Sequence, residues 1–426
     1  MEKDGVGSRP TVMGRRRSRR LLSFDFCLLT FDFSLLPFPF CHLIFALFFS
    51  LNLPASSFAQ DTKPYASIDR DAVNYSGPGR DASHDLAGPE IRIGLLLPLT
   101  GRRQAEGEAL QHAAQMAVDE ENATSLPAHR LTLVTRDESG PWGQASGQVV
   151  NLVFDDQAVA LITSGEGGPA HLAEQVGNKV GVPILTLSSD ATTTEINLPW
   201  IFRLGPTDTM QAQAFARDIY QHKKLQKVLL LSQNDRDGRM GSEAFLNAAA
   251  ALHAEAPTAI VVDPEKITEA LAGQVLANSQ AVVIWADAPT TSLFIAYVKK
   301  LQPQVPVYLC RKGAEDDPSV SSHITCSDCG GKNAPRWIAA ARENPQARAD
   351  FDQQYLARFG IEPGMGAAEA YDSVRIIAAS LRQAGPNRVR LRDALAAVSA
   401  YSGASGIIAF DHAGNDTSEV TLLELK

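Results

Sequence analysis

The sequence predicts an α/β fold made of two similar units, each a parallel sheet with helices on both faces. Three observations lead to this prediction. From residue 91 onwards, short apolar runs of strand length alternate with helical patterns, which is typical of parallel sheets. This alternation is interrupted at Gly205-Pro206 and then starts again. The content of 45% hydrophobic and 20% charged residues is that of a folded globular protein.

The N-terminal region has the features of an export signal. Arginines cluster between Arg15 and Arg20, a strongly apolar segment follows over 21–53, and Ser57-Phe58-Ala59 is a small-x-small cleavage pattern. We therefore expect residues 1–59 to be a cleaved signal peptide that directs the protein to the periplasm or another extracytoplasmic location. A retained anchor and a start at Met13 remain open alternatives.

Residues 60–89 are rich in Asp, Ser, Gly and Pro, so we expect a flexible leader there. The folded part then begins with the apolar run at 91–97, which Pro98 and Gly101 end. This run predicts a buried strand, a tight turn and the first helix. The expected segments of the first unit are helix 106–121, strand 130–135, helix 144–154, strand 158–163, helix 169–180, strand 183–187 and a crossing strand at 199–204.

The second unit repeats this alternation of strands and helices and is followed by a more helical region. Its expected segments are strand 227–231, helix 242–252, strand 259–262, helix 267–277, strand 281–285, helix 292–301 and strand 305–309. Helices are then expected at 345–359, 367–383 and 391–399, with short strands at 406–410 and 420–425. Because helices follow the second unit, the chain is expected to cross between the units more than once.

Charge and cysteine usage exclude several classes of function. The net charge is −9, which argues against a nucleic-acid partner because phosphate binding needs clustered Lys and Arg. Cys310, Cys326 and Cys329 follow the signal, and we expect one disulfide and one thiol without fixing which residues pair. The single C-x-x-C spacing has no second pair, so we expect no metal and no cofactor.

Five motifs occur in the order found in a known family. They are the opening strand and turn at 93–101, the fourth strand at 181–186, the segment 202–208, the helix segment 370–374 and the closing segment 403–416. In this order the chain resembles the type I periplasmic binding proteins of the leucine/isoleucine/valine-binding kind, the solute receptors of ABC importers. The resemblance covers residues 91–426.

The resemblance implies two lobes joined by a three-crossing hinge, with a ligand held in the cleft between them. Lobe 1 would comprise 90–204 and 331–402, and lobe 2 would comprise 205–330 and 403–426. Hinge closure on the ligand is the motion that such a fold implies.

The first implied contacts follow strands of lobe 1, where backbone N–H groups and helix N-termini suit a charged ligand group. Amino-acid-binding members often place a Ser after the third strand, whereas this sequence has Glu166-Gly167-Gly168. We therefore expect backbone donors from Gly167 and Gly168. The turn after the first strand directs Arg103 towards the cleft, where it could face an anionic group.

The loop after the fourth strand is Ser188-Ser189-Asp190, at the place of a small-small-Thr loop in the family. We expect all three residues in the ligand site. Asp190 at the family's Thr position would repel a carboxylate and attract an amine or a hydroxyl-rich ligand.

In lobe 2, Asp237 precedes Gly238 where the family often places Tyr, and Arg311 and Lys312 stand where it places an acidic residue. A branched-chain amino acid is therefore doubtful as the ligand, and Arg311 facing an anionic group is the sharper expectation. The alternative for each charged residue is a solvated loop position.

The function implied by the resemblance is that of an exported solute-binding protein. It would capture a small molecule, an amino acid or a related compound, and deliver it to an ABC permease without enzymatic chemistry. We expect a monomer. The alternative is an extracytoplasmic sensor lobe that acts with a signalling partner.

Overall fold

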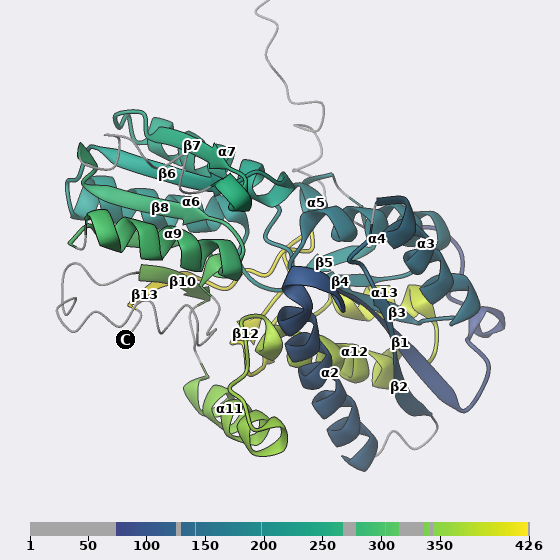
Figure 1. Ribbon diagram of the computed structural model, residues 1–426. Helices are drawn as coiled ribbons and strands as arrows, with labels where there is room; N and C mark the ends of the chain where they lie inside the picture. The colour runs from purple at the N-terminus through teal and green to yellow at the C-terminus, as the bar shows by residue number, and fades with distance from the viewer. Residues whose placement is uncertain are drawn as a thin grey trace, which may run out of the picture. The chain divides into compact units, whose positions relative to one another are not determined.

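The structure is a computed structural model that describes residues 74–124, 129–140, 142–196, 198–266, 278–302, 304–314, 336–340 and 344–424 (Figure 1). The chain divides into two units, 1–62 and 63–426, and all described residues lie in the second unit. The expected signal peptide, the helix 267–277, Cys326, Cys329 and the crossing near residue 331 lie outside the described residues.

Five parallel strands form the first sheet, in the order β2-β1-β3-β4-β5. Alternate residues of β1 enter different cores. Ile93 and Leu95 pack with the α2 and α12 side, whereas Leu96 packs with the α3 and α4 side. Burial on both faces explains why β1 is a continuous apolar run. The strands are β1 (Glu90–Leu97), β2 (Arg130–Asp137), β3 (Ala160–Thr163), β4 (Ile184–Thr186) and β5 (Ile201–Arg203).

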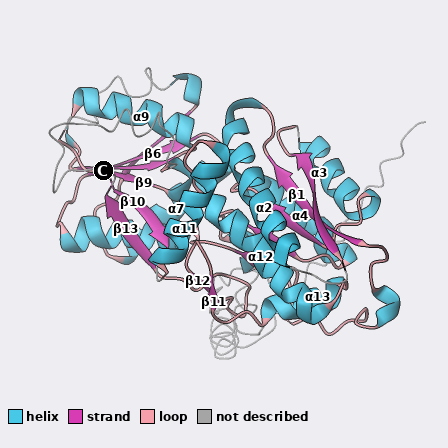
Figure 2. Cartoon of the chain, turned by 90° about the horizontal axis from the view of Figure 1, so that it is seen from below, coloured by secondary structure: helices cyan, strands magenta, loops and turns pink. Residues whose placement is uncertain are grey.

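Helices cover both faces of this first sheet. They are α2 (Gln104–Thr124), α3 (Trp142–Val150) with its π-helical continuation Asn151–Asp155, α4 (Gly167–Val180) and α5 (Thr192–Glu195). Two later helices, α12 (Ala367–Ala384) and α13 (Arg388–Ala396), return to the α2 face, as Figure 2 shows for α2 and α12. α11 (Pro345–Phe359) adds Phe351 and Tyr355 to the same core.

The second sheet has the order β13-β10-β9-β8-β6-β7. Helices α6 (Asp208–Ala216) and α7 (Arg236–Ala251) cover one face, and α9 (Ala288–Leu301) covers the other. Both sheets therefore have the expected α/β architecture. The strands are β6 (Val228–Gln233), β7 (Thr258–Val262), β8 (Ala281–Trp285), β9 (Val307–Leu309), β10 (Arg336–Ala340) and β13 (Val420–Glu424).

Three expectations about this architecture need correction. The second sheet is not wholly parallel, because β13 runs antiparallel to β10. β10 belongs to the second sheet through its pairing with β9, although the expected boundary assigned its residues to lobe 1. Conversely, Ala404, Ile408 and Phe410 pack in the core of the first sheet, although residues from 403 onwards were assigned to lobe 2. Here the short strands β11 (Tyr401–Ser402) and β12 (Ile407–Ile408) form a hairpin.

The prediction of a flexible leader is also wrong for the described residues 74–89, because these residues are attached to lobe 1. The Arg80 guanidinium lies 2.7 Å from the Asp393 carboxylate of α13. The buried side chain of Asn387 donates to the carbonyl of Gly79 at 3.0 Å. The ring of Tyr75 packs edge-on against Trp200, with the ring centroids 4.8 Å apart. The abundance of turn residues therefore reflects an irregular but attached segment, here called the N-terminal strap.

A fully buried arginine joins the loop after β4 to the segment around Asn415. Arg203, at the end of β5, donates to the carbonyl oxygens of Ser188 and Asp190, the latter at 2.9 Å, and to the hydroxyl of Thr194 at 2.7 Å. Its Nε donates to the Asn415 side chain at 3.2 Å. The loop after β4 is thereby fixed to the segment around Asn415, which is more than two hundred residues away in sequence.

Candidate functional site

The order of strands determines where the site lies. Among the parallel strands of each sheet, the strand order reverses at one point, beside β1 in the first sheet and beside β6 in the second. Ligands of such sheets bind at the carboxyl ends of the strands at this point. The segments that follow these strands contain Arg103 and Glu166 in lobe 1 and Asp237, in the first turn of α7, in lobe 2.

A carboxylate network spans the two lobes at this place. Two bases, Arg103 and Lys312, contact four carboxylates between them. Arg103 lies 2.7 Å from Glu106, 3.2 Å from Glu138 and 3.1 Å from Glu166. The members of this network are Arg103, Glu106, Glu138, Glu166, Asp237 and Lys312.

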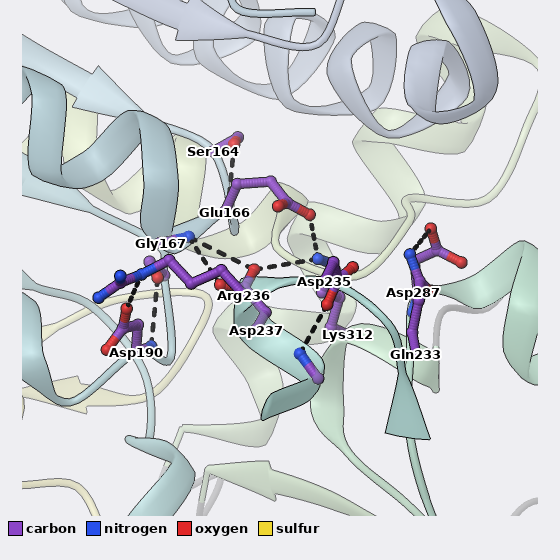
Figure 3. A network of polar contacts seen from close by, with 12 residues as sticks. Ser164, Glu166, Gly167, Asp190, Gln233, Asp235, Arg236, Asp237, Asp287 and Lys312 are labelled. Atoms are coloured by element: carbon purple, nitrogen blue, oxygen red, sulfur yellow. Dashed lines mark hydrogen bonds and ion pairs between the residues drawn. The ribbon is translucent and has the colours of Figure 1, made fainter. Parts of the chain in front are cut away.

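Lys312 makes the connection between the lobes. Its ammonium group pairs with Glu166 of lobe 1 and lies 3.1 Å from the Asp237 carboxylate of its own lobe, as Figure 3 shows. The Asp237 carboxylate in turn accepts a hydrogen bond of 3.1 Å from the N–H of Gly167, the first residue of α4. A carboxylate of lobe 2 therefore lies at a helix N-terminus of lobe 1, where negative charge is favourable.

Burial and charge shift the protonation of this network. Burial raises the pKa of Glu138 to about 8, against the opposing effect of Arg103 and the hydroxyl of Ser164. Burial also raises the pKa of Asp237, with Lys312 acting in the opposite direction. For Glu166, burial would raise the pKa, but Lys312 and Arg103 lower it to about 2. Glu166 is thus the ionised partner of the two bases, whereas Glu138 holds a proton near neutral pH.

Three further ion pairs cross between the lobes, and one of them joins Arg311 of lobe 2 to Glu369 of α12. Arg236, in the first turn of α7, lies 2.8 Å from the fully buried Asp190 carboxylate of lobe 1. Arg102 pairs with Asp287, whose carboxylate also caps α9 by accepting from the N–H of Thr290 at 2.9 Å. Together with Lys312 and Glu166, these contacts hold the strand ends of the two sheets against one another.

His171 extends the Asp190 contact. Its ring nitrogens lie 2.9 Å from Glu174 and 3.5 Å from Asp190. Burial alone would lower the pKa of His171, but hydrogen bonds and charge from these two carboxylates raise it to about 9. The raised pKa favours a cationic imidazole, which lies on the Asp190 side of the contact, with its Nε2 3.0 Å from Nη2 of Arg236.

A pocket opens beside the network, between the lobes. The space between its lining residues, together with the solvent that opens into it, amounts to about 410 Å³. Polar and charged residues from both lobes line it together with apolar side chains. The lining residues are Glu106, Leu110, Gly165, Leu187, Ser189, Arg311, Lys312, Met365 and Gly366.

The eight residues predicted from sequence lie in or near this region, but in different roles. Ser189 and Arg311 line the pocket. Two others, Arg103 and Asp237, belong to the network. The N–H of Gly167 donates to the Asp237 carboxylate. Whether these residues contact a ligand remains a prediction.

The remaining three predicted residues are committed to the protein itself. Asp190 pairs with Arg236, and the Ser188 carbonyl accepts from Arg203. Gly168 lies in the first turn of α4. These positions frame the site rather than line the pocket.

The two arginines expected to face an anion both have carboxylate partners. Arg103 is bound by the three glutamates of the network, and Arg311 pairs with Glu369 of α12. The i, i+3 spacing of Arg103 and Glu106 was a signal in the sequence for the first of these pairs. Glu369 is distant in sequence and gave no such signal.

The expected cysteine chemistry is tested only at Cys310, which is a buried free thiol. Burial raises the pKa of this thiol to about 12, so it is unreactive at neutral pH. Among the described residues, no cluster of His, Cys, Asp and Glu has the arrangement of a metal site. None of the described helices is long and apolar enough to cross a membrane.

Known proteins resemble this chain in sequence. The Leu/Ile/Val-binding protein BraC3 of Rhizobium johnstonii is 25% identical over 311 residues, which cover 70% of this chain and 81% of that protein. Glutamate receptor 3.4 of Arabidopsis thaliana is 22% identical over 291 residues, which cover 65% of this chain. That match spans only 30% of the receptor.

Solved structures resemble the chain in fold. A leucine-binding protein from Thermotoga maritima aligns with a TM-score of 0.69 at 18% identity, covering 79% of this chain and 95% of that one. A solute-binding protein of an ABC transporter from R. palustris, solved with benzoate, aligns with a TM-score of 0.67 at 18% identity, covering 79% and 93%. A family model described as a periplasmic binding protein matches residues 90–423, from β1 to β13. The chain belongs to this family of periplasmic binding proteins, whose members here are substrate-binding proteins rather than enzymes.

Proposed function

We propose that this chain is an exported solute-binding protein that captures an amino acid or a related small molecule between its lobes and delivers it to an ABC importer. The observation that carries the proposal is the pocket between the two sheets. Leu187 and Ser189 of lobe 1 and Arg311 and Lys312 of lobe 2 share its wall. A solute held there would touch both lobes, so its binding energy would favour their closure.

Delivery and export rest on the family and on the N-terminal sequence. The relatives include an amino-acid-binding protein and a solute-binding protein of an ABC transporter. The arginine cluster and apolar segment of residues 1–59 support secretion. A monomeric receptor would then present its solute to the permease in the membrane.

A screen of solutes tests the binding step. The protein without residues 1–59 would be heated with amino acids, amides, aromatic acids and short peptides, and the unfolding midpoint recorded. A true solute raises the midpoint as its concentration rises and lowers the radius of gyration in X-ray scattering if the lobes close further. Failure of every solute to do either would contradict a binding function.

Arg311 provides a sharper test of the pocket. We expect Arg311→Ala to abolish the stabilisation by solute, because it removes part of the wall and leaves Glu369 without its basic partner. Arg382→Ala is the matched control, since Arg382 also pairs with a glutamate, Glu121, but lies on α12 away from the pocket. If a stabilising solute is found and Arg311→Ala binds it unchanged, the pocket has been wrongly assigned.

A sensor lobe is the second candidate function. The observation in its favour is the match to part of a plant glutamate receptor. A sensor would bind solute equally well but would not stimulate transport. Solute uptake into cells that lack this chain distinguishes the two functions, because an importer subunit is required for uptake and a sensor is not.

A further inference from the structure

The charges of the carboxylate network do not balance. Arg103 and Lys312 supply two positive charges, whereas Glu106, Glu138, Glu166 and Asp237 can supply four negative ones. Buried charge without a partner is costly. The network therefore either holds protons or binds a further cation.

A second observation places this deficit at one oxygen. Glu138 is 5% exposed, and one of its oxygens accepts from Ser164 at 2.6 Å. Among the described residues, its other oxygen, Oε2, is buried and has no hydrogen-bond partner. A buried polar atom of this kind is rare and points to a missing donor.

The basic residues of the pocket wall are already occupied. Arg311 forms an ion pair with Glu369, although among the described residues its Nη2 makes no directed hydrogen bond, and Lys312 pairs with Glu166 and Asp237. An anionic solute would have to compete with protein carboxylates for these two side chains. A cationic solute would instead take the place of the proton that Glu138 holds near neutral pH.

We propose that the solute of this cleft is a small organic amine, whose ammonium group is bound by the carboxylates of the network and whose apolar body lies against Leu110, Leu187 and Met365. This inference rests on the proposed function and specifies its class of solute. The side chain of Lys312 already shows the binding mode, because its own ammonium group is held between two of the four carboxylates.

Binding of an amine has a measurable consequence for protons. The groups that face Glu138 are Arg103, Glu106, Ser164 and Glu166. Burial raises the pKa of Glu138 to about 8, so a bound cation displaces a proton below that pH. Affinity for an amine should then rise with pH, by up to about tenfold per unit if one proton is released.

Three compounds with the same isobutyl body test the proposal. Isoamylamine carries only the amine, isocaproate only the acid, and leucine both. We expect isoamylamine to raise the unfolding midpoint and isocaproate not to. Calorimetry in buffers of different ionisation heat should show proton release with isoamylamine at pH 7.

Glu138→Gln supplies the matched variant. It should abolish the proton release and the rise of affinity with pH, whereas Glu121→Gln should retain both. Glu121 is equally buried but pairs with Arg382 outside the network. If Glu138→Gln does not fold, calorimetry on the unaltered protein still tests whether amine binding releases a proton.

The outcomes separate the two proposals. Stabilisation by isocaproate, or by leucine but not isoamylamine, would overturn the amine class and leave solute binding intact. Binding of isoamylamine without proton release would overturn the role of Glu138. No binding by any of the three compounds or by the wider screen would overturn both proposals.

Discussion

Replacement of Lys312 by Met should open the two lobes. The Lys312 side chain is 14% exposed and bridges Glu166, which is 20% exposed, to Asp237, which is 9% exposed. Met removes the charge with little change in volume. Both carboxylates would then be left without this base in a largely dry contact, and Asp237 would have no other basic partner in the network.

The magnitude follows from the loss of a buried partner. Removing one member of a buried ion pair costs about 3–5 kcal/mol. Because these side chains keep some exposure and the lobes can separate to hydrate them, we use the lower bound of about 3 kcal/mol. At about 1.4 kcal/mol per factor of ten, the ratio of open to closed molecules should rise about a hundredfold.

Small-angle X-ray scattering without solute measures this change directly. Lys312→Met should increase the radius of gyration, whereas Lys300→Met, at an exposed position of α9, should not. Lys312→Arg should remain closed because it keeps the charge. Identical scattering curves for Lys312→Met and the unaltered protein would refute the view that this ion pair holds the lobes together.

Three further perturbations test other parts of the structure. Burial raises the pKa of Glu138 to about 8, above its value in the unfolded chain. Its contribution to stability is therefore full at acidic pH and is lost as the pH rises to about 8. Glu138→Gln should remove this pH dependence and so flatten the fall of the unfolding midpoint across that range. Arg80→Ala should lower the free energy of unfolding by about 1 kcal/mol and speed amide hydrogen exchange in the N-terminal strap. Unchanged exchange would show that contacts other than those of Arg80 attach the strap. Gly241→Ala should lower the free energy of unfolding by about 2–3 kcal/mol, because the new Cβ would lie 1.9 Å from the Trp285 ring. Gly147→Ala is the control, because no heavy atom of the described residues lies within 4 Å of its Cβ. In chemical denaturation it should leave the free energy of unfolding unchanged or raise it.

The fold was predictable because its strands are buried on both faces. A strand such as β1 has to be apolar at nearly every position, and such runs stand out against the helical patterns between them. β10 was missed because Arg336–Ala340 pairs with β9 and β13, partners that its local sequence does not specify. The N-terminal strap was missed because a composition rich in turn residues is the same for an attached and a free segment.

That the predicted residues gather at one place could be foreseen from the sequence, whereas their ion-pair partners could not. Because parallel strands end at one edge, residues after successive strands had to meet there, and Gly167, Ser189 and Asp237 do lie in this region. The contact between Lys312 and Glu166 joins positions 146 residues apart. Nothing in either local sequence indicates that pairing, which depends on how the two lobes meet.

The buried guanidinium of Arg203 has a consequence for the order of events during capture. Because it fixes the carbonyl groups of Ser188 and Asp190 to the segment around Asn415, lobe 1 would present an ordered half of the proposed solute site. A solute would then dock on lobe 1 first, and lobe 2 would follow. Under the proposed function, changes in lobe 2, for example at Lys312 or Arg236, should therefore alter the dissociation rate of the solute more than its association rate.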